Sequence, residues 1–211
     1  AQAAATDWLA GDHVEARLIA ATNGVGADGV LTLGIQLRLD EGWETYWRSP
    51  GDSGFPPQFD WSAGTNLGEV SIAWPAPRRF TILGMNTFGY IGYLVLPVTA
   101  KVPDPSQAVN VRLSVVYAVC RDVCFLVEQD FALDIPPGPG TEDAAMAALI
   151  EQYQAAVPIP SGPNLAVERV TVTGGATPSI EILARATDPF QAPDVIIESP
   201  QGFVFQAPTV R

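Results

Sequence analysis

The sequence predicts an all-β protein, in which an immunoglobulin-like β-sandwich is followed by one helix and a second, partial β segment. Short runs of alternating apolar and polar residues recur along the chain, and proline or glycine separates them. Only residues 142–156 carry the apolar spacing of a confident helix. With 211 residues, the chain can form one large β domain, or one domain and part of another.

The alternation is clear in residues 14–20 and stronger in residues 31–39, so both segments are predicted to be half-buried strands. Glycines between them mark a turn. An aromatic cluster follows at Trp43, Tyr46 and Trp47. Residues 49–57 are too rich in proline and glycine for regular structure, and we expect a long ordered loop there.

Further strands are predicted at residues 70–74, 93–100, 109–118 and 125–135. Many short strands separated by turn residues are typical of a sandwich, and an immunoglobulin-like topology is expected. Thr141-Glu-Asp143 supplies a helix N-cap and acidic residues for the first turn. One face of the predicted helix is apolar, and it consists of Met146, Leu149, Ile150 and Tyr153.

Three regions are therefore expected: a β domain at 1–137, a helix and Pro/Gly linker at 138–164, and a second β segment at 165–211. The second segment has strand candidates at 165–173, 179–186, 195–198 and 203–206. A complete sandwich needs about 100 residues. The segment is thus the beginning of a second β domain or an addition to the first.

Composition excludes several classes of partner. The formal net charge is −12, and the 11 Lys and Arg residues form no basic run, which argues against binding to nucleic acid or to an anionic membrane. No run of 18 apolar residues predicts direct membrane insertion. The small residues at the start are typical of a mature terminus left after export, and the oxidisable cysteine pair also fits an extracytoplasmic compartment.

The two cysteines, Cys120 and Cys124, interrupt a segment with the pattern of a β-strand. Four extended residue steps cover about 13 Å, whereas a disulfide needs Cα atoms about 4.4–6.8 Å apart, so the pair can bond only if residues 121–123 turn back. A bridge that closes so short a loop contributes only about 2 kcal/mol in the chain-entropy model.

Two interpretations of the pair stay open at this point: a structural bridge that pins a hairpin, and a redox-active dithiol. Arg121 would favour the thiolate and Asp122 would oppose it.

Other catalytic sets are poorly supported. Gly51-Asp-Ser-Gly54 looks like the nucleophile motif of trypsin-like proteases, but a serine nucleophile needs a base. The only histidine, His13, is expected to be an ordinary strand residue. One histidine, two cysteines and two methionines also cannot make a closed four-ligand metal site without carboxylates, so no metal is expected.

Five segments together carry a family resemblance over about residues 10–136: Gly42–Gly54, Trp74–Pro77, Thr87–Tyr90, Leu96–Val98 and Tyr117–Cys124. In this order they resemble the N-terminal periplasmic domain of the DsbD disulfide reductases, and more closely the ScsB branch. The cysteines are closer together than in the DsbD type, and the prolines usual after the second cysteine are replaced by Phe-Leu-Val.

The resemblance implies an immunoglobulin-like domain whose redox pair is Cys120 and Cys124, with Cys124 forming the mixed disulfides. It also implies that Phe88 and Tyr90 belong to an aromatic cap that shields the pair until a partner docks. Tyr117, Arg121 and Asp122 are candidate modulators of the pair.

On this basis the chain is expected to be a periplasmic thiol–disulfide exchange module that requires no cofactor. Its donor would be a membrane-embedded reductase domain of the DsbD/ScsB type, a thioredoxin-like domain, or both. Its client would be a periplasmic thioredoxin-like oxidoreductase. The alternative is a non-catalytic immunoglobulin-like binding or assembly module with a structural disulfide.

Overall fold

A computed structural model describes residues 5–82, 84–160, 162, 164–198 and 205–211. The chain forms two compact units. One contains Ala1–Val157 and Glu198–Phe205, and the other contains Pro158–Ile197 and Gln206–Arg211.

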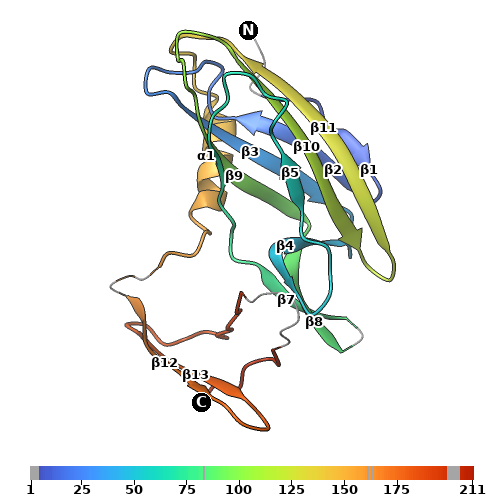
Figure 1. Cartoon of the computed structure of the whole chain (residues 1–211), viewed down its shortest axis with the longest axis vertical. Helices are drawn as coiled ribbons and strands as arrows, with labels where there is room; N and C mark the ends of the chain where they lie inside the picture. The colour runs from blue at the N-terminus through green and yellow to red at the C-terminus, as the bar shows by residue number, and fades with distance from the viewer. Residues whose placement is uncertain (1–4, 83, 161, 163, 199–204) are drawn as a thin grey trace. The chain divides into compact units, whose positions relative to one another are not determined.

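Two antiparallel sheets make up the first unit (Figure 1). The first has the order β1-β2-β3-β9-β6, with β1 at Leu9–Gly11, β2 at Val14–Ala20, β3 at Val30–Leu39, β9 at Tyr93–Lys101 and β6 at Val70–Ile72. The second has the order β11-β10-β4-β8-β7, with β11 at Cys124–Ile135, β10 at Val109–Cys120, β4 at Glu44–Gly51, β8 at Met85–Ile91 and β7 at Arg78–Ile82. A short strand, β5 at Gln58–Asp60, pairs with β10 as well.

The core lies between the inner faces of these sheets, because every second residue of each long strand is apolar and buried. Its most completely buried side chains include Leu18, Leu31, Leu33, Val98, Val111, Leu113 and Ile135. This arrangement confirms the predicted β-sandwich and the six strands predicted for it, which are β2, β3, β6, β9, β10 and β11.

The predicted helix is confirmed as α1 at Ala144–Gln154. The side chain of Asp143 caps it by accepting hydrogen bonds from the backbone N–H groups of Ala145 and Met146. Ile150 packs with Ile19 of β2 and Val95 of β9, and the other apolar helix residues surround this cluster. The helix therefore covers the outer face of the first sheet and belongs to the first unit.

The second unit contains a two-stranded antiparallel sheet of β12 at Leu165–Thr173 and β13 at Ser179–Ala186. Both strands were predicted. Residues 195–198 are not a strand, so that prediction was wrong. In the last predicted strand, residues 203 and 204 lie outside the described residues, and residues 205 and 206 have no regular structure.

The sequence did not predict the short strands β1 and β5, strand β4, or the hairpin of β7 and β8, which lie where a loop or no element was expected. The pairing of β4 with β8 shifts between Tyr46 and Gly51, so the run of residues 47–50 has no regular alternation. His13 was also placed wrongly, since it lies in the turn between β1 and β2 with a φ of 59°.

Substitution of Leu33 by alanine should lower the free energy of unfolding by about 2–5 kcal/mol, the usual cost of truncating a buried leucine. Leu33 is 0% exposed in the centre of the first sheet. Urea denaturation monitored by tryptophan fluorescence would measure the change. Val30→Ala is a control on the same strand, because Val30 is 40% exposed and should change stability by no more than about 0.5 kcal/mol.

Candidate functional site

Cys120 and Cys124 end the two longest strands and face each other across the β10–β11 hairpin. They form a disulfide with their Cα atoms 4.1 Å apart. Arg121, Asp122 and Val123 make the turn, and the N–H of Arg121 donates a hydrogen bond of 3.0 Å to the carbonyl of Val123. The turn that the cysteine spacing predicted is confirmed.

The two sulfur atoms lie in different environments. Cys120 is 1% exposed, because β10 lies between β11 and β4 in the sheet. Cys124 begins the edge strand β11 and is exposed to solvent. Cys124 is therefore the more accessible residue of the pair, and Cys120 is shielded.

An aromatic cover shields Cys120. Tyr46 and Ala118 form a buried cluster with Cys120, and Phe55 packs against this cluster. The hydroxyl of Tyr46 lies 3.9 Å from the sulfur of Cys124. Tyr46 and Phe55 were not among the predicted cap residues, although the aromatic run at 43–47 and its proline- and glycine-rich continuation were the signal for them.

The loop that carries Phe55 contains Gly51-Asp-Ser-Gly54, and its glycines explain this motif. A Cβ atom at Gly54 would lie 2.6 Å from the ring of Tyr46, and one at Gly51 would lie 2.4 Å from the carbonyl oxygen of Asn86. Both glycines also have positive φ, 88° at Gly51 and 132° at Gly54. The motif lets the loop pack closely on Tyr46 and β8.

Asp52 fastens this loop to β8. Its backbone N–H donates to the carbonyl of Asn86 at 2.8 Å, and its carboxylate accepts a hydrogen bond from the N–H of Asn86, also at 2.8 Å. Phe88 lies beneath the loop, since a Cβ atom at Gly51 would be 3.2 Å from its ring. Phe88 is therefore linked to the cover through the loop that carries Phe55.

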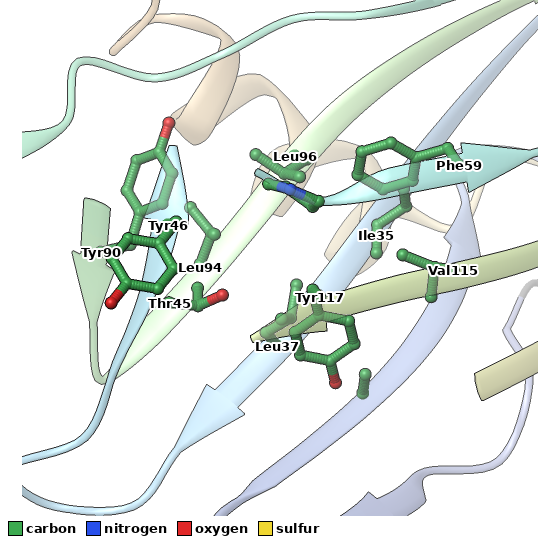
Figure 2. A pocket seen from close by; sticks show the side chains of 12 residues that line it. Ile35, Leu37, Thr45, Tyr46, Phe59, Tyr90, Leu94, Leu96, Val115 and Tyr117 are labelled. Carbon is green, nitrogen blue, oxygen red and sulfur yellow. The ribbon is translucent and has the colours of Figure 1, made fainter. Parts of the chain in front are cut away.

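Tyr90 faces the interior of the sandwich. Its hydroxyl donates a hydrogen bond of 2.8 Å to the carbonyl of Pro75, and burial raises the pKa of Tyr90. With Tyr117 it lines an apolar cavity between the sheets (Figure 2). Direct gating by Phe88 and Tyr90 stays a prediction.

The candidate modulators also differ in position. Tyr117 is three residues before Cys120 and so lies on the opposite face of β10, where its hydroxyl donates to the side-chain oxygen of Gln129 at 2.8 Å. Arg121 forms an exposed ion pair with Asp122 at 3.0 Å, and its guanidinium group lies 5.1 Å from the ring centre of Trp43. Their influence on the pair stays a prediction.

Glu44 is a further polar residue near the disulfide, and no sequence pattern indicated it. Its Cα is the strand partner of Cys120, and it is buried, with 7% of its surface exposed. Burial raises the pKa of the Glu44 carboxyl. Burial also raises the pKa of Tyr46, and the nearby charge of Glu44 adds to that shift.

The described residues contain no group of three or more His, Cys, Asp or Glu side chains arranged to hold a metal ion. Among the helices of the described ranges, none has the length and apolar character needed to cross a membrane.

A β-sandwich with a half-exposed, half-covered disulfide at the end of an edge hairpin has the geometry of a thiol–disulfide exchange domain. The sequence profile of the family "Thiol:disulfide interchange protein DsbD, N-terminal" matches residues 15–136, which is more than half of the chain. The chain belongs to this family. Residues 156–211 match a second family, described as a domain of unknown function (DUF8393). No curated protein matches the chain.

A solved structure agrees with the family assignment. The N-terminal periplasmic domain of ScsB from Proteus mirabilis is 26% identical and superimposes with a TM-score of 0.77, over 95% of this chain and 77% of that one. The N-terminal domain of Neisseria meningitidis DsbD in the reduced form is 16% identical, with a TM-score of 0.35, over 59% of this chain and 86% of that one. The similarity to the DsbD/ScsB N-terminal domains that the sequence suggested is confirmed.

Substitution of Phe55 by alanine should speed reduction of the disulfide by dithiothreitol. Burying a large apolar side chain stabilises by about 1.5–3 kcal/mol. If removal of the Phe55 ring lowers the free-energy barrier to exposing Cys120 by about 1.4 kcal/mol, the rate of disulfide reduction should rise about tenfold. Alkylation of the released thiols followed by mass spectrometry measures the rate. Leu126→Ala is the matched control, because Leu126 is 62% exposed on β11 and does not cover Cys120; equal rates in both variants would contradict a shielding role for Phe55.

Proposed function

We propose that this chain is a periplasmic thiol–disulfide exchange module that relays electrons through Cys120 and Cys124. A membrane-embedded reductase domain would reduce the pair, directly or through a thioredoxin-like domain, and the pair would then reduce a periplasmic thioredoxin-like client. Family membership supports thiol–disulfide interchange as the chemistry. The periplasmic origin of the similar ScsB domain supports the location.

The observation that carries the proposal is the difference in exposure between the two cysteine residues. Cys124 is exposed and Cys120 is 1% exposed, so only one of them is open to a partner. In the reduced protein, the Cys124 thiolate attacks the client disulfide and forms a mixed disulfide, releasing one client thiolate. Cys120 then attacks the sulfur of Cys124, which releases the second client thiolate and restores the Cys120–Cys124 bond.

The surface beside Cys124 favours a protein as the partner. Val123 is 57% exposed and Leu126 is 62% exposed, and both lie on the hairpin within two residues of Cys124. Apolar side chains around an exposed redox sulfur would be covered when a thioredoxin-like partner docks. Tyr46 and Phe55 would restrict access to Cys120 between encounters, and movement of Phe88 and Tyr90 in β8 would alter that restriction through the attached loop.

A relay disulfide should have a reduction potential above about −300 mV, because structural disulfides generally have lower potentials and resist reduction by cellular thiols. Equilibration of the protein in glutathione and dithiothreitol redox buffers, followed by alkylation, measures the potential. A value well below this limit would favour the alternative, an immunoglobulin-like binding module with a structural bridge.

The Cys120→Ala variant should accumulate a covalent complex through Cys124 with a periplasmic thioredoxin-like protein, because the residue that resolves the mixed disulfide is absent. Non-reducing electrophoresis and mass spectrometry would detect the complex. Cys124→Ala is the matched control and should form none, since Cys120 is shielded. A complex that forms equally in both variants would contradict the assigned roles.

A further inference from the structure

Glu44 occupies the position next to the disulfide in the second sheet. The Cα of Cys120 pairs with that of Cys124 on one side and with that of Glu44 on the other. Residues directly opposite each other in antiparallel strands point to the same face, with Cβ atoms about 4.5–5.5 Å apart. A glutamate carboxyl at this spacing is within reach of the neighbouring cysteine sulfur.

The neighbours of Glu44 support this orientation. Tyr46 is two residues further along β4 and so points to the same face as Glu44. That face carries the cluster of Tyr46, Ala118 and Cys120, and the Tyr46 hydroxyl lies 3.9 Å from the sulfur of Cys124. Thr45 points to the other face, because its strand partner is Val119, which is 0% exposed and neighbours Cys120 in β10. Glu44 therefore shares the covered side of the disulfide.

One oxygen of the Glu44 carboxyl is buried without a hydrogen-bond partner in the part of the chain that the structure describes. Only 7% of the residue is exposed, and Oε1 has no hydrogen-bond partner among the described residues. Burial of an unpaired carboxylate is costly, and such groups are usually protonated or functional. The raised pKa of Glu44 is consistent with a carboxyl that holds a proton more readily than an exposed one.

We propose that Glu44 exchanges a proton with the buried sulfur of Cys120 during each thiol–disulfide exchange. The inference rests on the proposed relay and assigns the proton donor and acceptor for Cys120, its buried cysteine. Cys120 is shielded from solvent, so its sulfur needs a proton donor and acceptor inside the cover.

The proton and electron balance is the same in both directions. When a donor thiolate attacks Cys124, a donor–Cys124 disulfide forms, the Cys120–Cys124 bond breaks, and Cys120 leaves as a thiolate that takes the proton of the Glu44 carboxylic acid. A second donor thiol then releases Cys124, so the donor is oxidised and the pair is reduced. During delivery, the Glu44 carboxylate takes the proton of the Cys120 thiol as Cys120 attacks the mixed disulfide.

Among the titratable groups near Cys120, Glu44 is the candidate for proton exchange with its sulfur. Cys120 and Cys124 come from the hairpin, and Tyr46 comes from β4, with a pKa raised above its already high ordinary value. On the other side, β8 places the neutral Ile91 opposite Glu44. Arg121 in the turn is paired with Asp122 and lies over Trp43.

The test measures reduction of the Cys120–Cys124 disulfide by dithiothreitol from pH 4 to 9, with each rate constant divided by the concentration of dithiothreitol thiolate. Below the pKa of the Glu44 carboxyl, which burial raises, the wild type and the Glu44→Gln variant both carry a neutral side chain. The variant should nevertheless be slower at low pH by roughly 100-fold, the lower end of what general acid–base groups contribute. As pH rises through the pKa of Glu44, the wild-type value should fall, whereas the variant should show no inflection.

Glu41→Gln is the matched control, because Glu41 is exposed three residues earlier and its loss removes the same charge. It should keep the wild-type inflection. Equal rates of wild type and Glu44→Gln at low pH, with a faster variant at high pH, would show that Glu44 acts only through its charge and would overturn the proposal. Trapping by Cys120→Ala reports on the relay separately, so the relay can stand while the role of Glu44 fails.

Glu44→Gln should fold, because a neutral amide replaces a buried acid of the same size. The neutral acid is the form favoured in the folded protein, so the contribution of Glu44 to stability is lost as pH rises above its ordinary pKa and through its raised one. At pH 8 the variant should therefore be at least as stable as the wild type in urea denaturation. A large loss of stability would mean that Glu44 is a structural residue and would overturn the proposal.

Discussion

The arrangement of this site depends on one constraint, the register of β10 between its two neighbours. That register places Cys120 in a single row with Cys124 on the edge strand and Glu44 on β4. Because residues in one row share a face, the same pairing exposes one sulfur, covers the other and brings a buried carboxyl beside it. A shift of one residue would turn both cysteines toward the interior of the sandwich.

The disulfide itself contributes little to the fold. Its two cysteines close the end of a hairpin that already pairs along twelve residues of each strand, so reduction would leave the hairpin and its core contacts in place. The proposed relay needs this independence, since the domain would have to stay folded in both oxidation states. The cover is held in a similar way: the backbone of the 51–55 loop is hydrogen-bonded to β8 rather than to the cysteine hairpin.

Regular apolar alternation made most strands of the sandwich predictable, and helix 144–154 followed from its apolar face and cap. β4 was not predictable in this way, because an irregular pairing interrupts it and its proline and glycine residues are typical of loops. For the same reason, the aromatic residues that cover Cys120 were not predicted. Phe88 and Tyr90 were selected from the family resemblance, whereas the structure places Tyr46 and Phe55 against Cys120.

By itself, the sequence determined that the two cysteines could bond only across a tight turn, because chain geometry over four residues allows no other arrangement. It also determined the sandwich, through the period of its apolar residues. Only the tertiary structure decided which sulfur is exposed, which aromatic rings cover the other, and which acid lies beside it. Those properties arise from pairing between β10 and a strand more than seventy residues away along the chain, and local sequence patterns carry no information on such long-range contacts.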